Sequence, residues 1–153
     1  MKKLKTFLGL VAFGLIVYVV LTIIMPKIAF SQKKGLLDSY KVSKTMEDTS
    51  DTYIIRLDMG KGTWEALEYE LDRIDFKPSD PAEFWTKNPD KDNFTAKEIT
   101  GFVKEYCRKT TKHLPVQEYY FTEYIAVMKD ENNEYHLYYE LRMGDHEIDP
   151  LTK

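Results

Sequence analysis

Hydrophobic and polar positions divide the chain into one long apolar run followed by short alternating segments. The run Phe7–Met25 holds 19 consecutive uncharged, mostly apolar residues. At ~1.5 Å per helical residue it covers roughly 28 Å, close to the ~30 Å hydrocarbon core of a bilayer. Apolar regions of secretion signals are shorter, about 7–15 residues. The pattern therefore predicts a short cytoplasmic head (1–5), a transmembrane signal-anchor helix (6–26) and a juxtamembrane linker (27–37).

A cleaved signal peptide is the alternative, because Ala29 and Ser31 place small residues at the −3 and −1 positions of a cleavage after Ser31. Basic residues flank the run almost equally, so the positive-inside rule gives little help with orientation. The very short head favours a signal anchor, which places a domain of residues 38–153 outside the cytoplasm. The basic residues that flank the apolar run are Lys2, Lys3 and Lys5 before it, and Lys27, Lys33 and Lys34 after it.

Alternating segments at both ends of this domain predict β-hairpins. Residues 40–46 and 53–59 alternate around the polar turn 47–51, and residues 116–143 alternate around the turn 129–134. A period of two assigns Tyr53, Ile55, Leu57, Leu137, Tyr139 and Leu141 to the core face of the sheet.

Two amphipathic helices are predicted between the hairpins. The first carries Trp64, Leu67, Leu71 and Ile74 on one face. The second follows a capping box at 95–98, with its apolar stripe at Ile99, Phe102, Val103, Tyr106 and Cys107. The connection 77–94 is a long loop that Phe84 and Trp85 attach to the core. The order ββααββ predicts an α+β two-layer sandwich, with a four-stranded antiparallel sheet and two helices on one face.

Charge and cysteine content exclude several classes of function. The chain has a net charge of −3, and because three lysines precede the apolar run, residues 27–153 carry −6. This acidic domain lacks the basic surface that nucleic-acid binding needs. A single cysteine, Cys107, excludes an intramolecular disulfide and a cysteine-based zinc site. We expect Cys107 to be a small buried hydrophobe rather than a nucleophile.

No motif predicts a catalytic residue, a metal site or a cofactor. Residues 88–99 partly resemble a calcium loop, but Ile99 occupies the position of the bidentate carboxylate and Asn93 that of the glycine. The acidic and histidine-containing segment 145–149 lies near the C-terminus, where we expect a solvated tail. The sequence 60–63 is too short for a phosphate-binding loop. No family is recognised in these residues, so fold and function are predicted from pattern alone.

The uncovered face of the sheet is the predicted binding surface, through His136, Tyr138, Glu140 and Arg142. The predicted function is a single-pass membrane-anchored protein with a small acidic extracytoplasmic domain that acts as a protein-binding module, for example an envelope-associated inhibitor, immunity or accessory protein. Its partners are the lipid bilayer, through residues 6–26, and another protein. The alternatives are a secreted protein and a small envelope enzyme without a recognisable motif.

Overall fold

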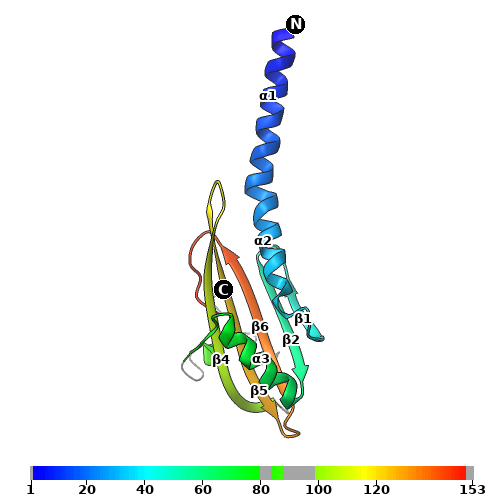
Figure 1. The fold of residues 1–153 in the computed structure, drawn as a ribbon, viewed down its shortest axis with the longest axis vertical. Coiled ribbons are helices and arrows are strands. Elements are labelled where there is room, and N and C mark those ends of the chain that lie inside the picture. Colours follow the sequence, from blue (N-terminus) through cyan, green and yellow to red (C-terminus); the bar gives the residue numbers. More distant parts are fainter. Residues whose placement is uncertain (1, 80–83, 88–98, 151–153) are drawn as a thin grey trace.

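A continuous helix forms the N-terminal part of the computed structural model, which describes residues 2–79, 84–87 and 99–150 (Figure 1). It comprises α1 (Lys2–Val19), the π-helical turn η1 (Val20–Ile24), α2 (Met25–Lys34) and the 3₁₀ turn η2 (Gly35–Leu37). The wider η1 turn ends two residues before Pro26, whose ring would clash with the carbonyl four residues earlier in a regular α-helix. The stretch Leu4–Leu37 is long and apolar enough to cross a membrane, and its apolar part is not buried against the domain.

The sheet is antiparallel throughout, with the strand order β1-β2-β6-β5-β4-β3. The α+β class predicted from the sequence is confirmed, but the sheet of the described residues has six strands rather than four. One helix, α3 (Lys61–Arg73), follows the first hairpin, as its apolar spacing predicts. The strands are β1 (Val42–Asp48), β2 (Thr52–Met59), β3 (Lys77–Pro78), β4 (Ile99–His113), β5 (Glu118–Asp130) and β6 (Tyr135–Gly144), and a 3₁₀ turn, η3, spans Trp85–Lys87.

The second predicted helix is wrong, because its apolar stripe lies in strand β4. Register irregularities occur between Ile99 and Gly101 and between Phe102 and Lys104. Such bulges change the face on which the following side chains lie. Phe102 consequently packs on one face of the sheet and Tyr106 on the other, although helical spacing would place them together. The capping box at 95–98 lies outside the described residues.

Helices α2 and α3 cover one face of the sheet, where the main core lies. Five of the six predicted inward-facing positions on β2 and β6 are buried in the main core, and the sixth, Tyr53, is partly buried against it. The core joins side chains from both helices and four strands: Ala29, Phe30, Leu37, Ile55, Leu57, Trp64, Leu67, Leu71, Phe76, Tyr106, Phe121, Ile125, Val127, Leu137, Tyr139 and Leu141.

Residues 27–37 are helical and form part of the domain, which corrects the expectation of a linker. Ala29, Phe30 and Leu37 are each almost completely buried. The sequence pattern did not indicate this, because lysines and polar residues alternate with these few apolar ones. The segment nevertheless supplies the second helix of the helical layer, in place of the helix expected after residue 95.

Candidate functional site

The predicted binding residues lie on the face of the sheet that alternation assigned to them, but this face is covered. Tyr138 has 0% of its surface exposed, Glu140 2% and His136 8%; the Arg142 side chain is also largely buried. The prediction of an exposed surface is therefore wrong. A second hydrophobic cluster explains the burial, and it consists of Ile54, Trp85, Tyr124, Ala126, Met128 and Tyr138.

Glu105 attaches the covering segment to the sheet. Its fully buried carboxylate accepts hydrogen bonds from the backbone N–H groups of Phe84 (3.2 Å) and Trp85 (3.1 Å) and from the Tyr124 hydroxyl (2.6 Å). The Trp85 ring then lies edge-on to Tyr138, with 5.4 Å between their centroids. The expectation that Phe84 and Trp85 attach this segment to the core is confirmed.

Three of the four predicted binding residues interact with one another. The Tyr138 hydroxyl donates to Glu140 Oε2 at 2.7 Å, and Arg142 Nε donates to Glu140 Oε1 at 2.5 Å. These contacts satisfy a carboxylate that is nearly inaccessible to water. Their arrangement is that of an internal polar cluster, in which the side chains stabilise the sheet.

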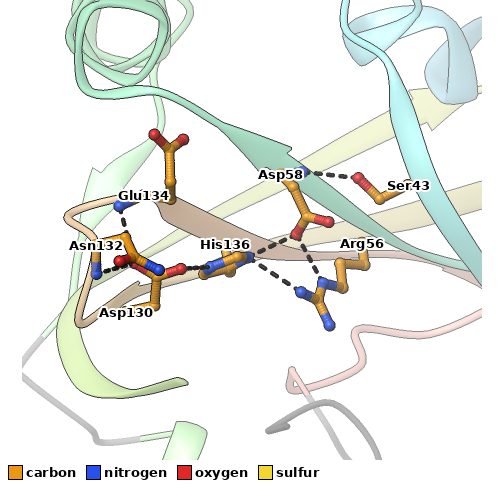
Figure 2. A network of polar contacts seen from close by, with 7 residues as sticks. All are labelled: Ser43, Arg56, Asp58, Asp130, Asn132, Glu134 and His136. Carbon is orange, nitrogen blue, oxygen red and sulfur yellow. Dashed lines mark hydrogen bonds and ion pairs between the residues drawn. The ribbon is translucent and has the colours of Figure 1, made fainter. Parts of the chain in front are cut away.

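The fourth predicted residue, His136, lies between two carboxylates (Figure 2). Its Nδ1 is 2.7 Å from Asp58 Oδ1, and its Nε2 is 2.9 Å from Asp130 Oδ2. Arg56 Nε donates to Asp58 at 2.7 Å, while Arg56 Nη2 lies 3.1 Å from His136 Nδ1. Each ring nitrogen of His136 therefore faces a carboxylate within this network.

This network changes the acidity of both carboxyl groups. Burial alone would raise the pKa of Asp58, but hydrogen bonds from His136, Arg56 and Ser43 outweigh it and lower that pKa. The hydrogen bond with His136 is the main reason that the pKa of Asp130 is lowered. The network joins β2, β5 and β6 near the β5–β6 turn, and its role is to hold these strands together.

A second fully buried carboxylate, Glu123, lies under helix α2. Arg108 donates to both of its oxygens at 2.7 Å, and the Tyr139 hydroxyl donates at 3.1 Å. Lys33 of α2 reaches the same carboxylate at 3.4 Å. Arg108 also donates to the backbone carbonyl of Ile74, just after α3, at 2.8 Å. We call these five residues the α2 junction, because they connect the N-terminal helix to the strands and to α3.

An open groove of about 370 Å³ lies between α3 and the β3–β4 edge of the sheet. Glu68 in this groove accepts hydrogen bonds from Lys104 (3.1 Å) and the Tyr106 hydroxyl (2.5 Å). These bonds outweigh the effect of burial and lower the pKa of Glu68. Tyr69 has 68% of its surface exposed. The groove is lined by Glu65, Glu68, Tyr69, Asp72, Pro78, Lys104 and Tyr106, and we call it the α3 groove.

Comparisons of the chain with protein-family models, with curated proteins and with solved structures find no match. The contacts and surfaces described above are therefore the basis for a functional proposal.

The remaining motifs have structural surroundings that the sequence did not indicate. Lys109 Nζ binds Glu147 (2.8 Å) and Asp149 (2.9 Å), and Thr122 Oγ1 donates to the carbonyl of Ile148 at 2.6 Å. Residues 145–149 thus contact the sheet, which the sequence did not indicate, although four of these five residues are exposed to solvent. Of the calcium-like loop, residues 88–98 lie outside the described residues. Within the described part of the chain, no three His, Cys, Asp or Glu side chains are placed to hold a metal ion.

Cys107 lies half-buried in strand β4 rather than on a helix. Burial is the main reason that the pKa of its thiol rises to about 11. A thiol of this pKa is almost entirely protonated at neutral pH, which makes it a weak nucleophile.

Sequence reasoning missed two of the buried glutamates, Glu105 and Glu123, and predicted the third, Glu140, to be exposed. Glu123 is the single charged residue in the stretch 119–128, which is otherwise rich in aromatic and β-branched residues. A lone charge in such a strand is a signal for a buried ion pair, because an unpaired buried charge is strongly unfavourable. Glu105 gives no such signal, because Lys104 precedes it and Arg108 and Lys109 follow it closely.

Proposed function

We propose that the chain is a single-pass membrane protein whose C-terminal domain lies outside the cytoplasm and acts as a protein-interaction module. One observation carries this proposal. The apolar helix continues without interruption into α2, and α2 contributes Ala29 and Phe30 to the core of the domain. The helix that would cross the bilayer is therefore also an element of the folded domain.

This continuity supports retention of the N-terminal segment rather than cleavage. Cleavage after Ser31 would divide α2 and remove both Ala29 and Phe30 from the core. Loss of one buried phenylalanine side chain typically destabilises a protein by about 3–5 kcal/mol. That is a large part of the roughly 5–15 kcal/mol by which a domain is stable.

The α2 junction supports a fixed orientation of the domain relative to the helix. Lys33 contacts the Glu123 carboxylate, and its ammonium lies 5.8 Å from the centre of the Phe121 ring. Next to the α2 junction, Lys34 binds Asp48 and lies 4.9 Å from the centre of the Tyr53 ring. These contacts engage β1, β2 and β5 together. A flexible tether would not need such contacts. A domain that presents one surface at a defined height above a membrane needs them.

We place the contact surface in the α3 groove, because Tyr138 and Glu140 are buried. An exposed tyrosine beside a concave surface is typical of binding hot spots. Three carboxylates and one lysine line the groove, so charge complementarity favours a partner that presents a basic segment. Tyr69 and the side chains of Glu65 and Asp72 are the residues to which we assign this contact.

Site-specific photo-crosslinking tests this proposal in native membranes. A photoreactive amino acid replaces Tyr69 in the full-length chain, and a matched protein carries it at Asn132, an exposed position in the β5–β6 turn. We expect a discrete adduct with a basic partner from position 69 only. The double substitution Glu65→Lys and Asp72→Lys should abolish it. Equal adducts from both positions, or an adduct that survives this charge reversal, would contradict the assignment.

A further inference from the structure

We propose that the turn joining β4 and β5, Leu114–Gln117, contacts the same bilayer that the N-terminal helix crosses. This inference rests on the proposed membrane span, and it concerns a different part of the molecule. It gives the β-sheet a direct lipid contact of its own, in addition to the helix.

Two contacts define how β5 runs relative to the N-terminal helix. Near the end of α2, Lys33 lies 3.4 Å from Glu123. Closer to the N-terminus of the helix, Ile23 and Pro26 line the same cavity of about 290 Å³ as Tyr119. From Glu123 to Tyr119, strand β5 therefore runs alongside the helix in the direction of the helix N-terminus.

The lengths of the two paths agree. Four residues of a strand cover roughly 13 Å, and the same distance along a helix corresponds to about nine residues. From Tyr119 the strand continues toward the turn, and Val116 lies three residues further, roughly 10 Å. That distance corresponds to about six or seven helical residues. It places Val116 level with residues 16–20, near the middle of the apolar run Phe7–Met25.

Figure 1 agrees with the direction of this path, since the β4–β5 hairpin extends beyond the other strands in the direction of the chain's N-terminus. The end of β6 and the β1–β2 turn do not reach as far: Gly144 and Ser50 line the same cavity as Ile23. The β4–β5 turn is thus the part of the described sheet that is placed deepest toward the membrane.

The chemistry of the turn fits the acyl region of the bilayer, with the headgroups nearer to the start of the hairpin. Its residues Leu114, Pro115 and Val116 are consecutive and apolar, and Val116 has 52% of its surface exposed. Apolar side chains gain free energy when they leave water for the acyl region. The preceding Lys112 is exposed and lies where lipid phosphates would be.

The backbone of the turn is also suited to an environment with little water. The Leu114 N–H donates to the Gln117 carbonyl at 3.1 Å, and the ladder pairs His113 with Glu118 directly below it. Pro115 has no N–H group to satisfy. Unsatisfied backbone groups are unfavourable in lipid, so a closed turn that contains proline can enter the interface more readily than an open loop.

Depth-dependent fluorescence quenching tests the inference in the full-length chain. The protein carries Cys107→Ala and one new cysteine, Val116→Cys, labelled with an environment-sensitive fluorophore, in phosphatidylcholine vesicles. Lipids with a quencher near the headgroup or deep in the acyl chain report the position of the label. Two matched proteins carry the label at position 16, in the apolar helix, and at position 132, in the opposite turn. A thermal melt establishes that each labelled protein is folded.

We expect the label at position 116 to be quenched several-fold more by the deep quencher than the label at position 132. The label at position 16 should be quenched most by the deep quencher. If position 16 is quenched and position 116 is not, the turn does not contact lipid and the inference is wrong, while the membrane span stands. A blue-shifted but unquenched label at position 116 would show contact with a second copy of the chain, and it also overturns the inference. An unquenched label at position 16 would overturn the proposed span itself.

Discussion

The ammonium of Lys33 lies 3.4 Å from the fully buried carboxylate of Glu123. This contact joins the helix that begins in the apolar run to the middle of the central strand β5. Arg108 and Tyr139 donate further hydrogen bonds to the same carboxylate. Since a buried ion is tolerated only when it is paired and hydrogen-bonded, Glu123 requires α2 and β4 to be in place together.

The substitution Glu123→Gln should destabilise the domain by about 3–5 kcal/mol, because it leaves the largely buried guanidinium of Arg108 without its charge partner. Chemical denaturation of the full-length protein in detergent micelles measures the change. The control is Glu118→Gln in the same strand, where the side chain is exposed and contacts His113 and the Tyr120 hydroxyl; we expect a change within about 0.5 kcal/mol. If Glu123→Gln lowers the free energy of unfolding as little as Glu118→Gln is expected to, the charge at the α2 junction adds nothing to stability.

Two tyrosine substitutions distinguish the covered face from the α3 groove. Tyr138→Ala should cost about 3–5 kcal/mol of unfolding free energy, because it removes a fully buried ring that packs on Trp85. Tyr69→Ala should change stability by no more than about 0.5 kcal/mol, since that ring is exposed. Thermal melts followed by circular dichroism give both values. A Tyr138→Ala protein that melts like the parent would restore the original prediction of an exposed binding face.

The network around His136 predicts that the domain loses stability in acid. The pKa values of Asp58 and Asp130 lie below their ordinary value of 3.8 in the folded protein. The unfolded chain therefore binds protons more readily, and the contribution of these groups is complete above about pH 5. It decreases as the pH falls through 3.8 and then through the lower folded-state pKa values.

Unfolding midpoints measured between pH 6 and pH 2 check this expectation. The substitution His136→Gln removes the main hydrogen bond to Asp130 and one of those to Asp58. We expect it to make the midpoint less dependent on pH below about pH 4, in addition to any constant loss of stability. An unchanged slope would mean that His136 does not lower the pKa values of these two carboxyl groups.

Cys107 should react slowly with alkylating reagents. With a pKa of about 11, roughly 0.1% of the thiol is ionised at pH 8, against about a quarter of an unperturbed cysteine with a pKa near 8.5. Partial burial slows the reaction further. The rate of iodoacetamide modification, followed by mass spectrometry, should be at least about 100-fold lower than that of free cysteine and should approach it in denaturant. Rapid modification of the folded protein would contradict the burial of this thiol.

The parts of the fold that were predictable are those in which the spacing of apolar residues determines which side of a strand or helix faces the core. Alternation around Ile55 and Tyr139 gives the correct core face of β2 and β6, and the spacing of Trp64, Leu67 and Leu71 gives α3. Strand β4 was missed because its bulges produce apolar spacings of three and four, which also fit a helix. A local pattern cannot separate these two cases in a single sequence.

The candidate site was less predictable, because its surroundings depend on residues distant in sequence. The face that carries Tyr138 is covered by Trp85, which is held there by Glu105. Nothing near residue 138 indicates this contact. The helical packing of Phe30 was similarly hidden, since a few apolar residues between lysines resemble a polar linker until the opposing strands are known.

The most direct test of the proposal that the helix spans a bilayer and presents the domain outside the cytoplasm is cysteine accessibility in intact cells. In the Cys107→Ala background, one full-length protein carries Asn132→Cys and a second carries Lys3→Cys, and a membrane-impermeant maleimide is added before or after permeabilisation. We predict that position 132 is labelled equally in intact and permeabilised cells, and position 3 only after permeabilisation. Labelling of position 132 only in permeabilised cells would contradict the account.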